Sequence, residues 1–350
     1  MQSLKIFFIQ SGGFDSLISG GNLYNQRMVE GLKDKGAKVT FIPLKRFPFP
    51  QHDDVEELRS HLEHIDDKSL VVIDSLVMGA VPELMQTYSR QLKIIGLIHL
   101  PLHLDIHHHE EIREKFRIQE LQCFNQVSAL IVPSPFTKDR LIGMGIRDSK
   151  IAVIRPGQDR PLTFREYPKI PVNLLCVSNI SRRKRQLDLL QALSGLKHHD
   201  WHLTLCGNTG FDPEYFESLR LLIENADLRE RVKFTGQLPH QELTTYYEQA
   251  DLFVFPSDFE SHPMVLAEAM AHKLPVVASR NGANEIILPP EITRFFMTGN
   301  VQELGEILHE LMTHESSYKN LTDACKTLKL TLPDWEESIT KLYHFLSRIK

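Results

Sequence analysis

FPSDFESHPMVLAEAMAHKLPVVAS, residues 255–279, is the stretch that decides the fold of this chain. It opens on the last residue of an apolar run that is short enough for a buried strand, and Pro256 ends that run. Ser261 is a favourable N-cap and Pro263 suits a first helical turn, so we expect a helix over Met264–His272. A second apolar run follows the helix. The stretch predicts a strand-loop-helix-strand unit whose polar loop lies at the carboxyl end of its first strand, where open parallel sheets bind ligands.

Two carboxylates frame this unit. Glu260 lies in the loop, and Glu268 lies about two turns into the helix. The start of a helix offers N–H groups and a partial positive charge to a phosphate, and a carboxylate can accept hydrogen bonds from two sugar hydroxyls. Two glutamates at this spacing are otherwise most often solvated surface residues. The unit is suited to a sugar phosphate.

A basic cluster follows another expected strand, over residues 173–178. Arg182 and Arg183 fall between that strand and an expected helix over 184–196, and Lys184 and Arg185 are the first two residues of that helix. Such a run is often a solvated face or a nucleic-acid tag, but here it falls at a strand end, so we expect part of it to point into the same crevice as the glutamates. A guanidinium or ammonium group there would hold a phosphate.

The rest of the chain alternates apolar runs with amphipathic segments, which is typical of parallel sheets covered by helices. We expect an α/β protein of two domains, residues 1–160 and 173–332, joined by a proline-rich linker over 161–172 and followed by an amphipathic helix over 333–350. The other strands expected are 5–10, 39–43, 70–73, 93–98, 130–132, 151–155, 202–206 and 232–235.

Composition excludes several classes of protein. Hydrophobic residues make up 42% and charged residues 24%, which is ordinary for a globular protein. A net charge of −5 and the lack of aromatic residues near the basic cluster disfavour nucleic-acid binding. The four cysteines form no Cys-x-x-Cys pair, and the sequence shows neither a signal peptide nor a membrane span. We expect a cytoplasmic protein, with peripheral membrane contact left open.

The first half holds three further candidate features. Gly20 and Gly21 begin an expected helix, where they allow either close approach of a ligand or only a tight turn. His99 closes a strand at its carboxyl end, as a cleft residue or as a hydrogen-bonded core histidine. In the histidine-rich stretch that follows, His103, Asp105, His107, His108 and His109 could be drawn as a metal site, but their spacing matches no recognised ligand pattern, and we predict no metal.

The pair of glutamates separated by seven residues, within FES-P-VL-EAMA, resembles the signature of glycosyltransferase family 4, the retaining GT-B enzymes of the group 1 glycosyl transferases. Residues 120–159 and the passage TGQLPHQELTTYYEQADLFVFPS resemble that family too. The resemblance implies two Rossmann-like, doubly wound domains facing a cleft, the second holding the donor and the first the acceptor. It also implies that the terminal helix crosses back to the first domain.

The resemblance further assigns roles to individual residues. Lys184 and Arg183 would be electrostatic catalysts, Glu260 would lie beside the transferred sugar, and His99 would contact the sugar or the acceptor. The residues implied to bind the donor are Gly20, Gly21, Asn179, Arg182, Ser261, His262, Pro263, Met264, Val265 and Glu268, with Glu268 on the ribose. The chain departs from the family pattern at Asn179, which replaces an arginine, and at Ser261 and Lys273, which replace glycines.

The function implied is the retaining transfer of a sugar from a UDP- or GDP-sugar to an acceptor hydroxyl in polysaccharide or glycoconjugate biosynthesis, without a metal or cofactor. The acceptor would be a glycan, a lipid-linked molecule or a small molecule. Two alternatives remain open at this point: a nucleotide-sugar epimerase or hydrolase on the same fold, and a non-catalytic subunit that binds a nucleotide sugar.

Overall fold

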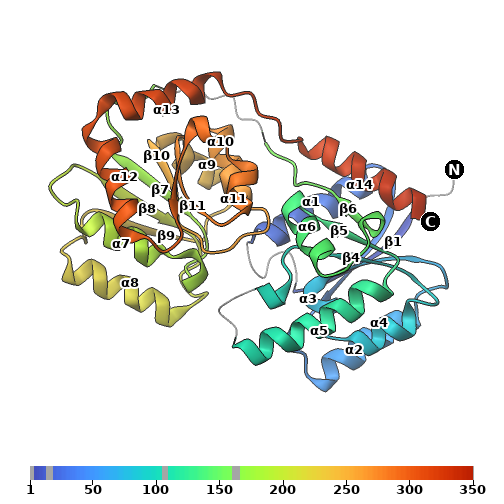
Figure 1. Cartoon of the computed structure of the whole chain (residues 1–350). Helices are drawn as coiled ribbons and strands as arrows, with labels where there is room; N and C mark the ends of the chain where they lie inside the picture. The colour runs from blue at the N-terminus through green and yellow to red at the C-terminus, as the bar shows by residue number, and fades with distance from the viewer. Residues whose placement is uncertain (1–3, 13–18, 105–108, 160–165, 350) are drawn as a thin grey trace. The chain divides into compact units, whose positions relative to one another are not determined.

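A computed structural model of the chain describes residues 4–12, 19–104, 109–159 and 166–349 (Figure 1). The chain divides into two compact units, of which unit 1 comprises residues 1–157 and 333–350 and unit 2 comprises residues 158–332. Each unit is described below by itself. The described part of the predicted linker belongs to unit 2, where the Tyr167 hydroxyl donates to the Lys273 carbonyl at 2.6 Å.

Unit 1 contains a six-stranded parallel sheet in the order β2-β1-β3-β4-β5-β6. Its strands are β1 (Lys5–Ser11), β2 (Lys38–Leu44), β3 (Leu70–Asp74), β4 (Lys93–Leu97), β5 (Ala129–Val132) and β6 (Ile151–Val153). Its helices are α1 (Gly20–Asp34), α2 (His52–Glu63), α3 (Ser75–Met78), α4 (Pro82–Tyr88), α5 (Glu110–Gln126), α6 (Pro135–Gly143) and α14 (Trp335–Ile349).

Unit 2 repeats this plan with the order β12-β11-β10-β7-β8-β9, again parallel. Its strands are β7 (Asn173–Val177), β8 (His202–Cys206), β9 (Val232–Gly236), β10 (Leu252–Phe255), β11 (Val276–Arg280) and β12 (Thr293–Met297). Its helices are α7 (Gln186–Ser194), α8 (Pro213–Asn225), α9 (His240–Gln249), α10 (Met264–Ala271), α11 (Ala283–Ile287), α12 (Val301–Thr313) and α13 (Glu315–Thr327). The α/β prediction of two doubly wound sheets is confirmed. The sequence had not indicated β12.

Strand order places a topological switch point in each sheet. The chain builds outward from β7 through β8 and β9, and then returns to the other side of β7 with β10. In unit 1 the corresponding point lies between β1 and β3. Loops that leave neighbouring strands in opposite directions at such a point make the crevice in which doubly wound sheets bind ligands.

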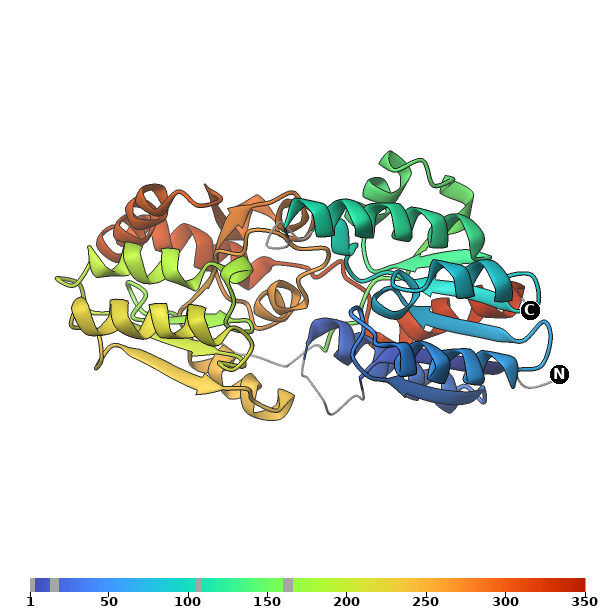
Figure 2. The ribbon, with the colours of Figure 1, turned by 90° about the horizontal axis from the view of Figure 1, so that it is seen from below.

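Alternating side chains of the strands bury both faces of each sheet. In unit 2, Leu174 and Val254 pack with α7, α8 and α12, while Leu175 and Phe253 pack with α9 and α10. Figure 2 shows α7 and α8 lying side by side in this layer. Near-continuous apolar runs such as β10 are therefore required, because both of their faces are covered.

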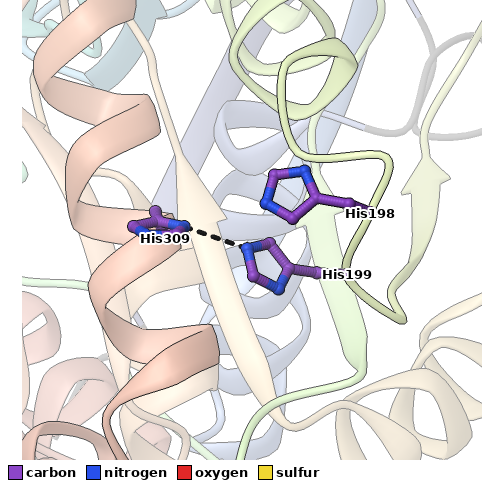
Figure 3. Close-up of side chains that lie close together, drawn as sticks. All are labelled: His198, His199 and His309. Atoms are coloured by element: carbon purple, nitrogen blue, oxygen red, sulfur yellow. Dashed lines mark hydrogen bonds between the residues drawn. The ribbon is translucent and has the colours of Figure 1, made fainter.

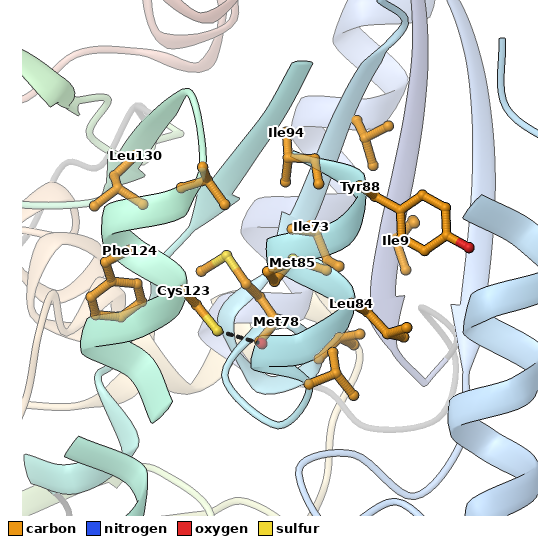
Figure 4. Packing of buried hydrophobic residues seen from close by; sticks show 14 of the residues in the cluster. Ile9, Ile73, Met78, Leu84, Met85, Tyr88, Ile94, Cys123, Phe124 and Leu130 are labelled. Carbon is orange, nitrogen blue, oxygen red and sulfur yellow. Dashed lines mark hydrogen bonds between the residues drawn. The ribbon is translucent and has the colours of Figure 1, made fainter. Parts of the chain in front are cut away.

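Helices α4 and α5 cover one face of the unit 1 sheet (Figure 4). Met85 of α4 and Phe124 of α5 are both fully buried there. The Cys123 thiol donates to the Met78 carbonyl at 3.1 Å, and burial raises the pKa of this thiol to about 12. This core makes unit 1 a packed body in its own right.

Helix α14 packs on α1 within unit 1. Its buried residues Ile339, Leu342 and Leu346 recur at helical spacing. Gly31 of α1 leaves room for Ile339, since a Cβ added at Gly31 would lie 2.3 Å from the Ile339 Cδ1. Residues at the end of the chain thus complete the core of the unit that begins it.

Candidate functional site

Two loops at the switch point of unit 2 form the core of the candidate site. One follows β7 and runs through a short 3₁₀ turn, and the other follows β10. The Asp258 N–H donates to the Arg183 carbonyl at 2.8 Å, and the Arg183 guanidinium donates to the Phe259 carbonyl at 2.6 Å. These hydrogen bonds hold the basic loop against the acidic loop.

Glu260 lies at the centre of this arrangement, with only 7% of its surface exposed. Its Oε1 atom lies 2.5 Å from the Lys184 Nζ and 3.3 Å from an Arg183 guanidinium nitrogen. The same oxygen accepts a hydrogen bond from the Ser257 hydroxyl. Two cations and one hydroxyl therefore converge on a single carboxylate oxygen.

The charges in this cluster affect one another strongly. Burial alone would raise the pKa of Glu260, but Lys184 and Arg183 hold it below its usual value, so the carboxylate stays ionised. Burial lowers the pKa of Lys184, while Glu260 opposes that change. Its ammonium group also lies 5.2 Å from the centre of the Phe255 ring, within reach of a cation–π interaction. With both cations and the carboxylate ionised, the cluster carries one net positive charge in a largely dry setting, which suits it to a phosphate group.

Glu268 is the fifth residue of helix α10, about one turn from its start rather than the two turns expected from a cap at Ser261. Its Oε2 atom accepts a hydrogen bond of 2.7 Å from the Tyr247 hydroxyl, which comes from α9. Burial raises the pKa of Glu268, and Tyr247 offsets part of that rise. The carboxylate is thus fixed in orientation by a neighbouring helix, as a group that binds sugar hydroxyls would need to be.

Arg182 and Asn179, both predicted to bind the donor, lie in other interactions. Arg182 lies within 3.5 Å of Asp212 and within 3.2 Å of Glu214, at the start of α8. The Asn179 side chain accepts a hydrogen bond from the Asn208 N–H at 3.2 Å, which ties the loop after β7 to the loop after β8. The structure therefore brings Arg183 and Lys184 to Glu260 and directs Arg182 to different carboxylates.

The prediction that Ser261 caps helix α10 is wrong. The N-cap is Pro263, and the first helical residue is Met264. A residue that precedes proline is disfavoured in the helical conformation, which explains why the helix does not extend back to His262 and Ser261. Val265 lies in the first turn, and its carbonyl accepts a hydrogen bond of 3.4 Å from the Tyr247 hydroxyl.

Two neighbouring positions have local structural roles. Lys273, at the place of a family glycine, has a left-handed φ of 57° just beyond the end of α10. Its Nζ donates to the Leu328 carbonyl at 2.5 Å. Glu285 accepts hydrogen bonds from the N–H groups of Asn281 and Gly282 at the start of α11.

His99 belongs to a polar network at the switch point of unit 1. Its Nε2 atom lies 2.8 Å from the Asn25 Oδ1 and 4.0 Å from an Asp74 carboxylate oxygen. The Asn25 amide donates to Gln10 at 2.8 Å and to Asp74 at 3.3 Å. Burial lowers the pKa of His99, although Asp74 opposes this, and burial raises the pKa of Asp74. A neutral ring that donates from Nε2 leaves Nδ1 as the hydrogen-bond acceptor.

The glycines at the start of α1 make room for this histidine. A Cβ added at Gly21 would lie 3.2 Å from the His99 Cδ2, and Gly20 is the first residue of the helix. The edge of the Tyr24 ring also packs on His99, with ring centres 5.3 Å apart. In this structure the group that lies close to the Gly21 backbone is the His99 ring.

The histidine-rich stretch is only partly described. His103 is buried, and its Nδ1 lies 2.6 Å from a carboxylate oxygen of Glu120. Asp105, His107 and His108 lie outside the described residues. The described part thus places His103 in a buried hydrogen bond with Glu120.

Sequence reasoning missed five residues of these networks, namely Tyr247, Ser257, Gln10, Asn25 and Asp74. Asp74 ends a buried strand at its carboxyl end, which is a signal that could have been used. Asn25 and Tyr247 sit within helical patterns, where nothing local distinguishes them from surface residues.

Across the described residues, no helix has both the length and the apolar character needed to span a membrane.

Comparison with known proteins agrees with this geometry. Residues 164–327 match the family "Glycosyl transferases group 1". The amylovoran biosynthesis glycosyltransferase AmsK of Erwinia amylovora is 28% identical over 217 residues, covering 59% of this chain and 52% of AmsK. The putative colanic acid biosynthesis glycosyltransferase WcaL of Salmonella typhimurium is 26% identical over 221 residues, covering 58% of this chain and 53% of WcaL. The chain spans about half the length of these curated relatives.

Solved structures resemble the whole chain. A sucrose-phosphate synthase from Thermosynechococcus elongatus superposes with a TM-score of 0.80 at 19% identity, covering 99% of both chains. Anabaena Alr3699/HepE, solved in complex with UDP and glucose, superposes with a TM-score of 0.76 at 18% identity, covering 99% of this chain and 100% of that one. The match to the glycosyl transferases group 1 family is thus confined to residues 164–327, while the chain as a whole has the GT-B fold of known glycosyltransferases.

Proposed function

We propose that this chain is a retaining glycosyltransferase of family 4, which transfers a hexose from a UDP- or GDP-sugar to an acceptor hydroxyl without a bound metal. The observation that carries the proposal is the convergence of the partly buried Arg183 and Lys184 on the buried Glu260, at the switch point of unit 2. Retention and metal independence rest on the resemblance to family 4.

The cluster would act on the leaving group. Bond cleavage places negative charge on the diphosphate, and preorganised cations stabilise that charge most where water is excluded. Lys184 and Arg183 are already held in place by Glu260 and by the Phe259 carbonyl. Both cations are therefore in position before a substrate binds, and the diphosphate would share or replace their contacts with Glu260. The N–H groups at the start of α10, around His262 to Met264, would bind the phosphates.

Glu268 would bind the ribose hydroxyls, with Tyr247 setting the direction of its carboxylate. Glu260 would lie beside the transferred sugar, and His99 would contact that sugar or the acceptor. AmsK and WcaL are named for amylovoran and colanic acid biosynthesis, which supports a glycan or lipid-linked acceptor in polysaccharide biosynthesis for this chain.

The donor can be found by thermal stabilisation. UDP, GDP, ADP and their sugars would each be added to the chain, because a ligand at a hundred times its Kd adds about 2.7 kcal/mol of stability. The best donor is then incubated with candidate acceptors in the presence of a chelator, and the anomeric configuration of the product is determined by NMR. An inverted product would reject retention, and a free or isomerised sugar would favour a hydrolase or an epimerase.

Point variants test the assigned roles. Lys184→Ala and Glu268→Ala should each lower kcat/KM by about a hundredfold or more with folding intact. Lys319→Ala and Glu217→Ala are matched controls in the same unit, because both side chains are largely exposed in local ion pairs. Turnover at the wild-type rate in either test variant would reject its role. Nucleotide binding without donor consumption by the wild type would indicate a binding subunit instead.

A further inference from the structure

Three histidines gather on unit 2 away from the loops described above (Figure 3). His198 and His199 lie between α7 and β8, and His309 lies on α12. One ring nitrogen from each lies within 4.8 Å of the others, and this is the only such cluster among the described residues. The turn that carries His198 and His199 leads into the amino end of β8. The Glu260 cluster lies at the carboxyl ends of the strands, so the two groups belong to opposite edges of the sheet.

The rings are close enough to share a ligand. The His199 Nε2 lies 2.9 Å from the His309 Nδ1, and the ring centres of His198 and His199 are 4.0 Å apart. Tetrahedral zinc with bonds of 2.0–2.1 Å places its nitrogen ligands about 3.4 Å from one another. Small side-chain movements would bring all three nitrogens to that spacing.

The backbone beneath these rings is firmly held. The His199 N–H donates to the Leu196 carbonyl at 3.0 Å, and the Arg231 guanidinium donates to the His199 carbonyl at 2.6 Å. The fully buried Trp201 donates from its indole to the Leu196 carbonyl at 3.0 Å. A turn fixed at these points presents its imidazoles without a large loss of backbone freedom.

The chemistry of the donors indicates the class of ligand. The cluster contains imidazoles alone, which suit zinc, copper, nickel and iron, whereas magnesium and calcium require oxygen ligands. In the ligand-free chain the short contact between His199 and His309 is a shared N–H···N hydrogen bond, which a metal ion would replace.

We infer that His198, His199 and His309 bind one divalent transition-metal ion of the zinc type, each through one ring nitrogen, with the fourth position open to water. The ion would join helix α12 to the turn before β8. This site is independent of the proposed transferase function, because none of its residues lies in the loops assigned to the donor.

The test uses the full chain without a polyhistidine tag, stripped of metal with a chelator and then dialysed. Zn²⁺ is titrated by calorimetry, and Co²⁺ by its visible absorption, whose intensity distinguishes four-coordinate from six-coordinate binding. We expect about one ion per chain, a four-coordinate cobalt spectrum and a higher Tm with Zn²⁺ present.

The variants His309→Gln and His199→Gln should each raise the Kd for Zn²⁺ by about 10–100-fold or more. Loss of a residue that only hydrogen-bonds to a metal ligand already costs that much, and these variants remove a ligand itself. Circular dichroism would verify that both variants fold. His202→Gln, which alters a nearby exposed histidine outside the cluster, should bind like the wild type. Three results would overturn the inference: no binding of Zn²⁺ by the wild type at micromolar concentrations, binding by both cluster variants as in the wild type, or loss of binding in the His202→Gln control.

Discussion

Glu260 has the most demanding environment of any single residue in the candidate site. It is buried and counters two cations, so its charge is required by the fold as well as by the proposed chemistry. A diphosphate that arrives at Lys184 and Arg183 must compete with this carboxylate for their hydrogen bonds. The site is therefore held in a polarised state before any substrate binds.

Removing that charge should be costly. Glu260→Gln leaves two cations partly buried without a counter-ion, and breaking such a pair costs about 3–5 kcal/mol. We expect the free energy of unfolding, measured with urea, to fall by an amount of that order. Glu217→Gln, whose ion pair with Arg220 is more than half exposed, should change it by less than about 1 kcal/mol. Similar losses in the two variants would show that the cluster is not electrostatically coupled.

His99 should make folding sensitive to pH in a defined window. Burial lowers its pKa in the folded chain, while in the unfolded chain it titrates near its ordinary value of about 6.5. As pH falls below 6.5 the unfolded chain gains a proton that the folded chain does not, so stability is lost until the pH passes the folded pKa. One such proton gives a slope of at most about 1.4 kcal/mol per pH unit.

As pH falls below 6.5, the free energy of unfolding of the His99→Gln variant should therefore decrease less steeply than that of the wild type. Urea unfolding at several pH values measures the difference between the two slopes. The raised pKa of Asp74 acts in the opposite sense, because its contribution is present at low pH and is lost as pH rises. Equal slopes in the two proteins would contradict the assignment of a buried, neutral His99.

Local spacing could predict part of the site and not the rest. Lys184, Arg183 and Glu260 each follow a strand that is recognisable in the sequence. The positions of these strand ends were enough to predict that the three side chains lie close together. Asn25 and His99 are 74 positions apart, and the hydrogen bond between them depends on the order of strands in the sheet. No local pattern encodes that order.

The packing of helix α14 on α1 depends on the absence of a side chain at Gly31. The Ile339 side chain occupies the volume that a Cβ at Gly31 would fill. Gly31 is also in a helix interior, where alanine is otherwise preferred over glycine by roughly 0.5–1 kcal/mol. Sterics and propensity therefore act in opposite directions at this position.

Gly31→Ala should be destabilising, because overpacking costs about 1–3 kcal/mol and exceeds the gain in helix propensity. Gly143→Ala in α6 of the same unit is the control, because a Cβ there meets nothing within 4 Å. It should be neutral or stabilising. Thermal unfolding of the two variants checks the pair, and a stabilised Gly31→Ala protein would mean that α14 is not packed as described.

Helices and strands with a clear hydrophobic pattern could be predicted from the sequence. The start of a helix that is fixed by a proline, and a strand at the edge of a sheet, were harder to predict. The apolar run of β10 and the amphipathic pattern of α14 are visible in the sequence. The start of α10 was misplaced because Pro263 overrides the capping tendency of Ser261. Strand β12 was missed because Thr293–Met297 contains an arginine, follows two prolines and lies at the edge of its sheet.

At the scale of the whole molecule, each unit buries a core of its own. Leu346 of α14 is fully buried in unit 1, and Leu308 of α12 is fully buried in unit 2. Domains with separate cores need not unfold in a single transition. The two-unit architecture thus has a calorimetric consequence.

Leu346→Ala and Leu308→Ala should each cost about 2–5 kcal/mol, the range for deleting a buried leucine side chain. Differential scanning calorimetry should show two components, with Leu346→Ala lowering the Tm of one and Leu308→Ala lowering the Tm of the other. A nucleotide that binds unit 2 should raise only the component that Leu308→Ala lowers. A single transition shifted equally by both variants would show that the units unfold as one.

The return of the chain to unit 1 through α14 also bears on how the protein is made. During synthesis, residues 1–157 leave the ribosome long before residues 333–350, yet the Gly31 face of α1 is covered only by the latter. Unit 2 is continuous in sequence and can close its core while the first unit still exposes an apolar surface. Within this chain, unit 1 is therefore begun before unit 2 but completes its core after it.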